Sequence, residues 1–304
     1  MTGVWIITED LVGERVDVAA SRLSGLTRSR ISELVEINAL TLNSHPVAKS
    51  RKVSLSDVLE IQDMREKTLS LVPRLAPGTQ IVYDDDALAV VDKPAGVAAH
   101  PAFGWEGPTV VEHLIAVGIQ ISTSGDAWRQ GIVQRLDAGT SGLMAVAKNE
   151  AAYTGLKTAF AQRTVRKIYH TLVSGELEPS EGVIDAPIGR HPGNDFKMAV
   201  VSSGRYAITE YSTIEKYRST SLLRIQLLTG RTHQIRVHML ALKHPCVGDP
   251  VYGGDKALAA KIGLTRQWLH AVELGFTHPI TGAQLVFASP YPPDLAQALA
   301  KVER

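Results

Sequence analysis

The hydrophobic pattern of this 304-residue chain changes once, and the change divides it into two parts. In the first sixty residues, apolar side chains recur at helical spacing over 16–23 and 31–35, and short strand patterns follow. From about residue 80 the apolar runs are short, β-branched and bounded by turns, with helical patterns near 109–116, 150–162 and 232–242. We therefore expect an N-terminal module, 1–62, a linker, 63–79, and a larger domain, 80–304.

The larger domain is expected to belong to the α+β class. Its strand patterns outnumber its helical patterns and do not alternate regularly with them, which favours a mixed or antiparallel sheet over a doubly wound one. The stretch 62–80 is polar and holds two prolines and one glycine, a composition typical of a linker.

In the N-terminal module, Thr27 is placed to begin the second helix and Asn38 to end it, and Asn43 and Ser44 predict a turn between strands. Between positions 22 and 52 six basic residues face only two acidic ones. A solvated helix face and a phosphate-binding surface both fit that excess. The basic residues are Arg22, Arg28, Arg30, Lys49, Arg51 and Lys52.

Composition excludes several classes of protein. The single cysteine, Cys246, rules out a disulfide framework and suits a reducing cytoplasm. The first residues lack the basic region of a signal peptide, and no apolar run reaches the roughly 18 residues that span a bilayer. The formal net charge is only +1, so a polyanionic partner must be argued from local patches. We expect a soluble cytoplasmic protein.

The usual cofactor motifs are missing. The sequence has no Walker-type phosphate loop, no G-x-G-x-x-G turn and no G-x-S-x-G nucleophile elbow. His233 and His238 are five residues apart on a predicted helix, about 140° around its axis, so they do not converge on a metal. We expect neither a metal nor a nucleotide cofactor.

Three stretches combine charged residues with glycine turns. "GIVQRLDAGTSGLMAVAK" places Arg135 and Asp137 before a Gly-Thr-Ser-Gly turn, and "LLTGRTHQIRVHM" places Arg231 and Arg236 around a helix start. "TVRKIYHTLVSG" places Tyr169 in a strand after the basic residues Arg163, Arg166 and Lys167. Each residue also has an ordinary interpretation: Asp137 as a turn cap, Tyr169 as core, Arg236 as a surface ion pair.

Four motifs, "VVDKPAG", "RLDAGTSG", "KIYHTLVSG" and "GRTHQIRVHM", resemble those of the RluA-type RNA pseudouridine synthases, in that family's order. The N-terminal module resembles an S4-like αL RNA-binding domain, and the combination is similar to the RluD-like large-subunit rRNA synthases. The sequence departs from the family patterns at four positions, where Asn38 and Ser56 replace glycines, Gln134 replaces a histidine and Thr171 replaces an alanine.

The resemblance implies an isomerase that converts uridine to pseudouridine without cofactor. It implies that Asp137 either attacks the sugar or removes a ribose proton, that Arg236 holds Asp137 ionised, and that Tyr169 packs on the uracil ring. Arg135 would replace the flipped base in the RNA stack. The remaining expected RNA contacts in this domain are Gln134, Arg231, His233 and Gln234, joined by the six basic residues of the module.

We expect the substrate to be structured RNA, with 23S ribosomal RNA as the favoured choice. We expect the protein to act as a monomer. Three alternatives stay open: a transfer RNA synthase, a catalytically weak RNA-binding protein on the same scaffold, and a carboxylate glycosidase. The last would need a second catalytic acid, for which the sequence offers no clear candidate.

Overall fold

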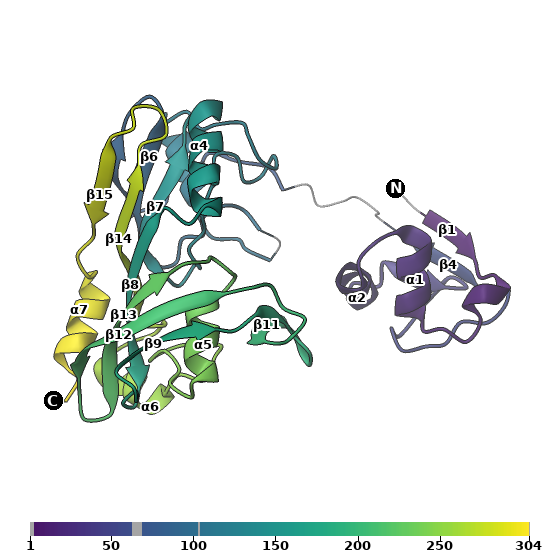
Figure 1. The fold of residues 1–304 in the computed structure, drawn as a ribbon. Helices are drawn as coiled ribbons and strands as arrows, with labels where there is room; N and C mark the ends of the chain where they lie inside the picture. Colours follow the sequence, from purple (N-terminus) through teal and green to yellow (C-terminus); the bar gives the residue numbers. More distant parts are fainter. Residues whose placement is uncertain (1–2, 63–68, 103, 304) are drawn as a thin grey trace. The chain divides into compact units, whose positions relative to one another are not determined.

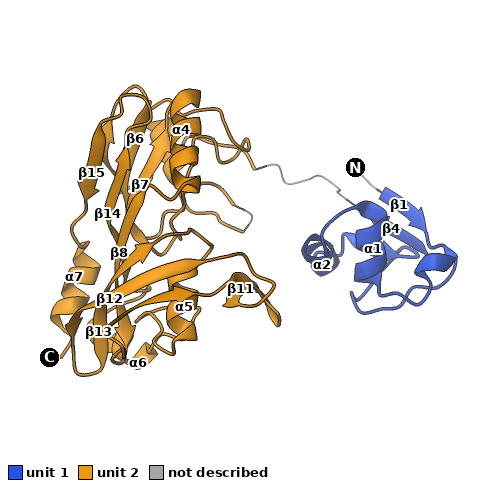
Figure 2. Ribbon diagram, in the orientation of Figure 1, with its two compact units in different colours: residues 1–68 blue, residues 69–304 orange. Residues whose placement is uncertain are grey.

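The computed structural model describes residues 3–62, 69–102 and 104–303, except for the side chains of residues 195 and 196. The chain forms two compact units, 1–68 and 69–304 (Figure 2). Each unit has a buried hydrophobic core of its own.

The first unit packs two helices on a small antiparallel sheet (Figure 1). Its strand order is β1-β4-β2-β3, and the core lies between the helices and this sheet. The elements are β1 (Gly3–Ile6), a 3₁₀ turn (Glu9–Leu11), α1 (Val16–Ser24), α2 (Arg28–Glu36), β2 (Leu40–Leu42), β3 (His45–Pro46) and β4 (Val58–Ile61). Strand β1 was not predicted, because its apolar residues Val4 and Ile6 face solvent at the edge of the sheet.

Local sequence explains how these elements begin and end. The hydroxyl of Thr27 accepts a hydrogen bond from the backbone N–H of Arg30 at 3.3 Å, which caps α2 as predicted. Asn38 and Ser56 adopt φ of 55° and 66°, so both turns keep the left-handed backbone that a glycine would supply. Residues 43 and 44 also have positive φ, as a two-residue hairpin turn requires.

The second unit is built on a nine-stranded mixed sheet in the order β5-β6-β7-β14-β8-β13-β12-β9, with β15 paired to β14. Every pairing in it is antiparallel except that of β7 with β14. This confirms the predicted mixed sheet. The strands are β5 (Gln80–Asp84), β6 (Leu88–Lys93), β7 (Ser141–Ala147), β8 (Arg166–Ser174), β9 (Glu181–Asp185), β12 (Ile208–Lys216), β13 (Thr220–Leu227), β14 (Leu269–Thr277) and β15 (Gln284–Ala288).

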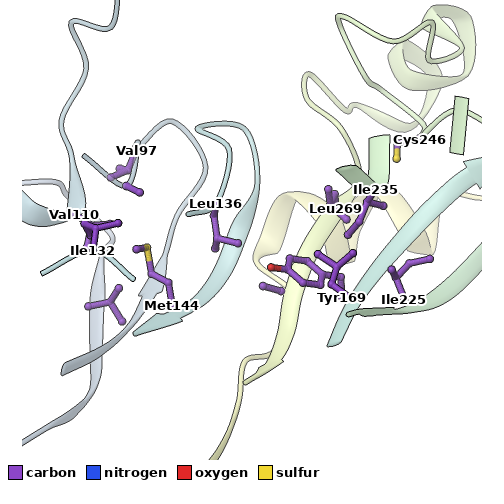
Figure 3. Close-up of a cluster of buried hydrophobic side chains, with 14 of the residues drawn as sticks. Val97, Val110, Ile132, Leu136, Met144, Tyr169, Ile225, Ile235, Cys246 and Leu269 are labelled. Carbon is purple, nitrogen blue, oxygen red and sulfur yellow. The ribbon is translucent and has the colours of Figure 1, made fainter. Parts of the chain in front are cut away.

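Helices cover both faces of this sheet. One face carries α3 (Val110–Ala116) and α5 (Gln234–Ala241), whose apolar side chains join the cluster that surrounds Tyr169 (Figure 3). The other face carries α4 (Glu150–Ala161), α6 (Lys256–Ile262) and α7 (Pro293–Ala300). A separate hairpin, β10 (Ile188–His191) and β11 (Asn194–Val200), lies outside the main sheet. The sequence analysis did not predict α6, α7 or the strands β9 to β12.

The expected linker is shorter than its polar composition indicates. Residues 69–79 belong to the second unit, where Ala76 is fully buried and its backbone N–H donates to the ring of His113 at 3.1 Å. The backbone N–H of Arg74 donates to the carbonyl of Glu112. The polar residues of this stretch therefore follow from its path along the surface beside α3, and residues 63–68 of the predicted linker lie outside the described residues.

Candidate active site

Asp137 lies in the loop that enters β7, at the wall of a pocket of about 500 Å³. The loop turns immediately afterwards, with the N–H of Thr140 donating to the carbonyl of Asp137 at 2.9 Å. A Cβ at Gly139 would lie 2.7 Å from the amide oxygen of Gln267, so a larger residue in this turn would displace the Gln267 side chain. The carboxylate of Asp137 stays 24% exposed and faces the pocket.

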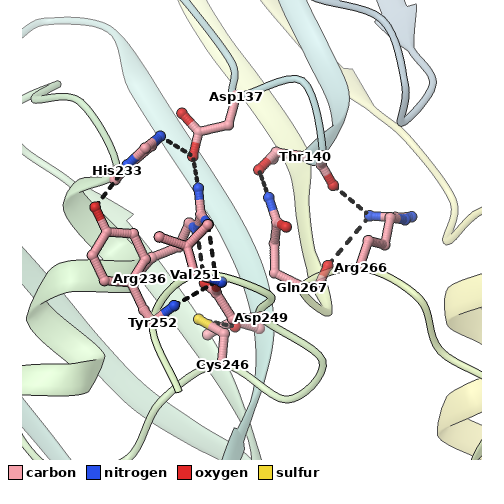
Figure 4. A network of polar contacts seen from close by, with 12 residues as sticks. Asp137, Thr140, His233, Arg236, Cys246, Asp249, Val251, Tyr252, Arg266 and Gln267 are labelled. Carbon is pink, nitrogen blue, oxygen red and sulfur yellow. Dashed lines mark hydrogen bonds and ion pairs between the residues drawn. The ribbon is translucent and has the colours of Figure 1, made fainter. Parts of the chain in front are cut away.

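Arg236, in the first turn of α5, holds that carboxylate (Figure 4). Its Nη1 donates to Oδ2 of Asp137 at 3.0 Å, while its Nε and Nη2 donate to the two oxygens of Asp249 at 2.7 and 2.9 Å. Burial raises the pKa of Asp249, but the hydrogen bonds and charge of Arg236 outweigh it, so the pKa lies below its usual range. Arg236 is thus a fixed, permanently charged donor beside Asp137.

His233 and Tyr252 complete one side of this site. His233 adopts a left-handed φ of 57° just before α5, and its Nε2 lies 3.9 Å from Oδ2 of Asp137. Its Nδ1 lies 2.7 Å from the hydroxyl of Tyr252, whose ring centroid is 4.9 Å from the guanidinium carbon of Arg236. Burial lowers the pKa of His233, and Asp137 opposes this, so the imidazole is held towards its neutral form.

A buried lysine lies behind the Asp137 turn. Lys93 ends β6 with its ammonium enclosed, donating to the carbonyls of Pro94 and Val97 at 2.9 and 2.7 Å and lying 3.5 Å from that of Ala138. Burial lowers its pKa to about 7, although the negative charge of Asp137 acts in the opposite direction. Near pH 7, Lys93 is therefore a partly protonated amine on the inner side of the Asp137 turn.

Tyr169 forms the floor of the pocket from the middle of β8. It is 6% exposed, and burial together with the charge of Asp137 raises its pKa, so the phenol stays neutral. A second hollow of about 50 Å³ adjoins the pocket between Asp137, His233 and Arg236. A flat aromatic ring and a held carboxylate therefore face the same space.

Arg135 and Gln134 lie on the rim of that space. Arg135 is exposed, with one contact at 3.3 Å from its Nη2 to the hydroxyl of Thr232. Gln134 lines the pocket, and its amide nitrogen is buried without a hydrogen-bond partner among the described residues. The guanidinium of Arg135 is therefore accessible to a molecule that enters the pocket, and Gln134 forms part of the pocket lining.

Gln234 differs from the expectation that it contacts RNA. Its amide oxygen accepts from the hydroxyl of Thr229 and the N–H of Arg231, and its amide nitrogen donates to the carbonyl of Ile208 and the hydroxyl of Thr209. These four bonds use the whole hydrogen-bonding capacity of the amide. Gln234 therefore fixes the loop that carries Arg231, and its amide has no hydrogen-bonding group left over for RNA.

The six basic residues of the first unit are not equivalent. Arg28 is paired with the buried Asp17 at 2.7 Å, and Arg30 with Glu33 at 2.7 Å. Arg22, Lys49, Arg51 and Lys52 are exposed and have no ion pair within the part of the unit that the structure describes. These four, rather than all six, are free to meet an anion.

Sequence reasoning missed three residues of the site, namely Lys93, Asp249 and Tyr252. Lys93 lies inside the quoted "VVDKPAG" motif, but nothing in the sequence shows that its ammonium turns inward. The stretch "GDPVYG" at 248–253 has the composition of a turn, which was its only available signal. Asp249 caps that turn with bonds from the N–H groups of Val251 and Tyr252 while it grips Arg236.

Two kinds of site have no candidate in the described part of the chain. Its histidine, cysteine, aspartate and glutamate side chains form no group of three or more that could hold a metal ion. None of its helices has the length and apolar character needed to cross a membrane.

Comparisons with known proteins identify the family of this chain. Residues 87–241 match the family described as RNA pseudouridylate synthase. A Nitrosomonas europaea protein named ribosomal large subunit pseudouridine synthase D is 41% identical over 303 residues, covering 97% of this chain and 86% of that protein. A Mycobacterium bovis protein named as an uncharacterized RNA pseudouridine synthase is 50% identical over 294 residues, 96% of each chain.

Solved structures with a similar fold come from the same family. The solved structure of human RNA pseudouridylate synthase domain containing 1 matches with a TM-score of 0.59 and 28% identity, over 74% of this chain and 90% of that one. The structure of human RNA pseudouridylate synthase domain containing 4 matches with a TM-score of 0.56 and 25% identity, over 73% and 92%. With relatives aligned over nearly its whole length, the chain belongs to the RNA pseudouridylate synthase family, and it is an isomerase.

Proposed function

We propose that the enzyme isomerises specific uridines of large-subunit ribosomal RNA, with Asp137 as the reacting carboxylate. The observation that carries this proposal is the ion pair of Asp137 with Arg236 at 3.0 Å, on the wall of a pocket floored by Tyr169. Relatives from Nitrosomonas europaea and Neisseria meningitidis, 41% and 40% identical, are named ribosomal large subunit pseudouridine synthase D. Their names supply the choice of substrate.

The reaction requires the protein mainly to position the uridine and to hold a charged carboxylate beside its sugar. The N1–C1′ bond of uridine breaks, the uracil rotates, a C5–C1′ bond forms, and the proton lost from C5 is balanced by one gained at N1. Asp137 serves either by attacking the sugar or by removing a ribose proton. Arg236 keeps this carboxylate ionised and oriented, and Tyr169 supplies the surface on which the uracil ring lies. The reaction is redox-neutral and needs no cofactor.

The rim residues suit a nucleotide taken out of a helix. The exposed guanidinium of Arg135 would fill the vacated place in the RNA stack, which offsets part of the unstacking cost of a few kcal/mol. The unpartnered amide nitrogen of Gln134 would donate to the flipped nucleotide. A glutamine amide can donate such a hydrogen bond as well as the histidine that the family pattern has at this position.

The first unit is proposed to be an S4-like domain that binds folded RNA. Two helices on an antiparallel sheet, with four unpaired basic side chains, give it the charge for phosphate contacts. A ribosomal substrate also supports a cytoplasmic location, and we expect the enzyme to act as a monomer.

One structural observation bears on the glycosidase alternative. Asp249 shares Arg236 with Asp137, but the side chain of Asp249 is fully buried and both its oxygens are held by Arg236. It cannot deliver a proton to a substrate as the second catalytic acid of a glycosidase would.

The test is pseudouridine formation on ribosomal and transfer RNA by the purified enzyme and its Asp137→Asn variant. We expect product in ribosomal RNA only, and a loss of at least about a thousandfold in the variant, because an amide neither attacks nor accepts a proton. RNA affinity should change little, since phosphate contacts carry most of it. Product in transfer RNA alone would overturn the substrate, and an active variant would overturn the role of Asp137.

A further inference from the structure

Lys167 is a buried cation that the steps above do not use. It precedes Tyr169 by two residues in β8, so both side chains lie on the same face of the sheet, and both line the pocket. Lys167 is only 8% exposed, yet within the described residues its ammonium has no hydrogen bond or ion pair. Its nitrogen lies 5.7 Å from the centroid of the Phe160 ring.

Three arginines gather beside it around Tyr206. The Nε of Arg231 donates to the backbone carbonyl of Tyr206 at 2.8 Å, and the guanidinium of Arg163 lies 5.1 Å from the centroid of the Tyr206 ring. Arg205 precedes Tyr206 and is exposed. Like Lys167, these arginines have no acidic partner in the part of the chain that the structure describes.

The four cations act on one another. Burial lowers the pKa of Lys167 to about 8, and the charges of Arg163 and Arg231 add to that effect. Burial and the charges of Arg205 and Arg163 likewise lower the pKa of Arg231. Arg166, by contrast, is the neighbour of Lys167 on the strand but is exposed and paired with Glu273 at 2.6 Å. Of these four cations, Lys167 and Arg231 line the pocket itself.

We propose that Lys167, with Arg163, Arg205 and Arg231, binds one backbone phosphate that adjoins the target uridine. The proposal rests on the proposed RNA substrate. If the uracil lies on Tyr169, a phosphodiester that flanks the uridine becomes the anion nearest to the ammonium of Lys167, which is two residues away along β8. That phosphate supplies the counter-charge that this cluster of cations lacks, and it fixes the nucleotide at its backbone while Asp137 meets its sugar.

The experiment is a double-mutant cycle between the protein and the RNA. Oligonucleotides carry the uncharged methylphosphonate at one linkage at a time around the target uridine, and dissociation constants are measured for wild type, Lys167→Met, Arg205→Gln and the control Arg166→Gln. At one linkage we expect neutralisation to weaken wild-type binding by about tenfold, the strength of one charge-assisted contact. The same linkage should have a clearly smaller effect on Lys167→Met, in which only the three arginines still contact the phosphate, and Arg166→Gln should behave like wild type.

Salt dependence gives a second readout. Lys167→Met should reduce the slope of log K against log salt by about one, and Lys167→Arg should restore it. Losses that add at every linkage, or unchanged affinity and slope in Lys167→Met, would overturn the proposal. A variant that binds normally but loses turnover with a displaced pH profile would instead make Lys167 an acid–base group. If Lys167→Met does not fold, the exposed Arg205 carries the same cycle.

RNA affinity and pseudouridine formation are measured as separate quantities, so this proposal and the proposed function can fail separately. If wild type shows the phosphate coupling but forms no pseudouridine in ribosomal RNA, only the proposed function fails. If it forms pseudouridine but shows no coupling at any linkage, only the phosphate site fails.

Discussion

Arg236 divides its N–H groups between two aspartates in very different surroundings. Asp249 is fully enclosed and takes two hydrogen bonds, whereas Asp137 is partly exposed and takes one. A buried ion pair fixes the guanidinium before any substrate arrives, so the donor that Asp137 meets is already oriented. The role of Asp249 is to position Arg236.

The Arg236–Asp249 ion pair predicts that a second substitution can restore stability without restoring activity. Arg236→Met leaves the carboxylate of Asp249 buried without a counter-charge, which should lower the free energy of unfolding by about 3–5 kcal/mol. The double variant Arg236→Met/Asp249→Asn should regain part of that stability, measured by urea denaturation, because an amide oxygen can still accept from the N–H groups of Val251 and Tyr252, but it should stay inactive. A double variant that recovers turnover would show that Arg236 serves the fold alone.

Lys93 predicts how stability depends on pH. Its folded pKa of about 7 lies below the usual 10.5 of an unfolded lysine, so between these values the unfolded chain binds more protons at this site. The free energy of unfolding of wild type, relative to Lys93→Met, should therefore rise from pH 7 to pH 9. Paired thermal denaturation at several pH values tests this, and a difference that stays constant or falls would contradict the inward, unpaired ammonium.

At the scale of elements, the residue that follows α4 has a backbone conformation that favours glycine, but a side chain that we propose binds RNA. Arg163 follows the helix with φ of 61°, a left-handed position that glycine usually occupies. A non-glycine residue there costs roughly 1–2 kcal/mol. With this backbone, the guanidinium of Arg163 lies beside the Tyr206 ring and close enough to Arg231 to lower its pKa.

Arg163→Gly should consequently raise the melting temperature while it weakens RNA binding. The stability gain follows from relief of the backbone strain, and the loss of affinity follows from one fewer cation at the phosphate site. Calorimetry and a binding titration on the same sample measure both. Arg163→Lys is the matched control, because it keeps the charge and the strain; equal RNA affinity in Arg163→Gly and wild type would contradict this role.

Local signals account for what the sequence predicted well. Thr27 and Asn38 mark the ends of α2, and apolar runs mark the strands β6, β7, β8 and β13. Helix α6 had comparable signals that were not used, an N-cap at Asp255 and a left-handed Gly263 at its end. Asp249 could not be assigned to Arg236, because their pairing depends on how a turn 13 residues away folds back on α5.

At the scale of the whole molecule, the two units have separate cores and can be tested separately. Removal of residues 1–62 should leave a folded domain that still isomerises uridine but binds ribosomal RNA more weakly at low salt. The difference in affinity should shrink as salt rises, because screening removes phosphate contacts first. Equal affinity of the full and shortened proteins at low salt would remove the case for an RNA role of the first unit.

The parallel pairing of β7 with β14 has a consequence for the enzyme's own synthesis. His270 pairs with Ser141, and Arg266 donates to the carbonyl of Gly139, 127 residues earlier in the chain. The strands β5, β6 and β7 can associate as they leave the ribosome, but the turn beside Asp137 gains its support only when residues near 270 emerge. A nascent chain therefore carries Asp137, the carboxylate that we propose reacts, close to the RNA that we propose it modifies, well before the residues near 270 support its turn.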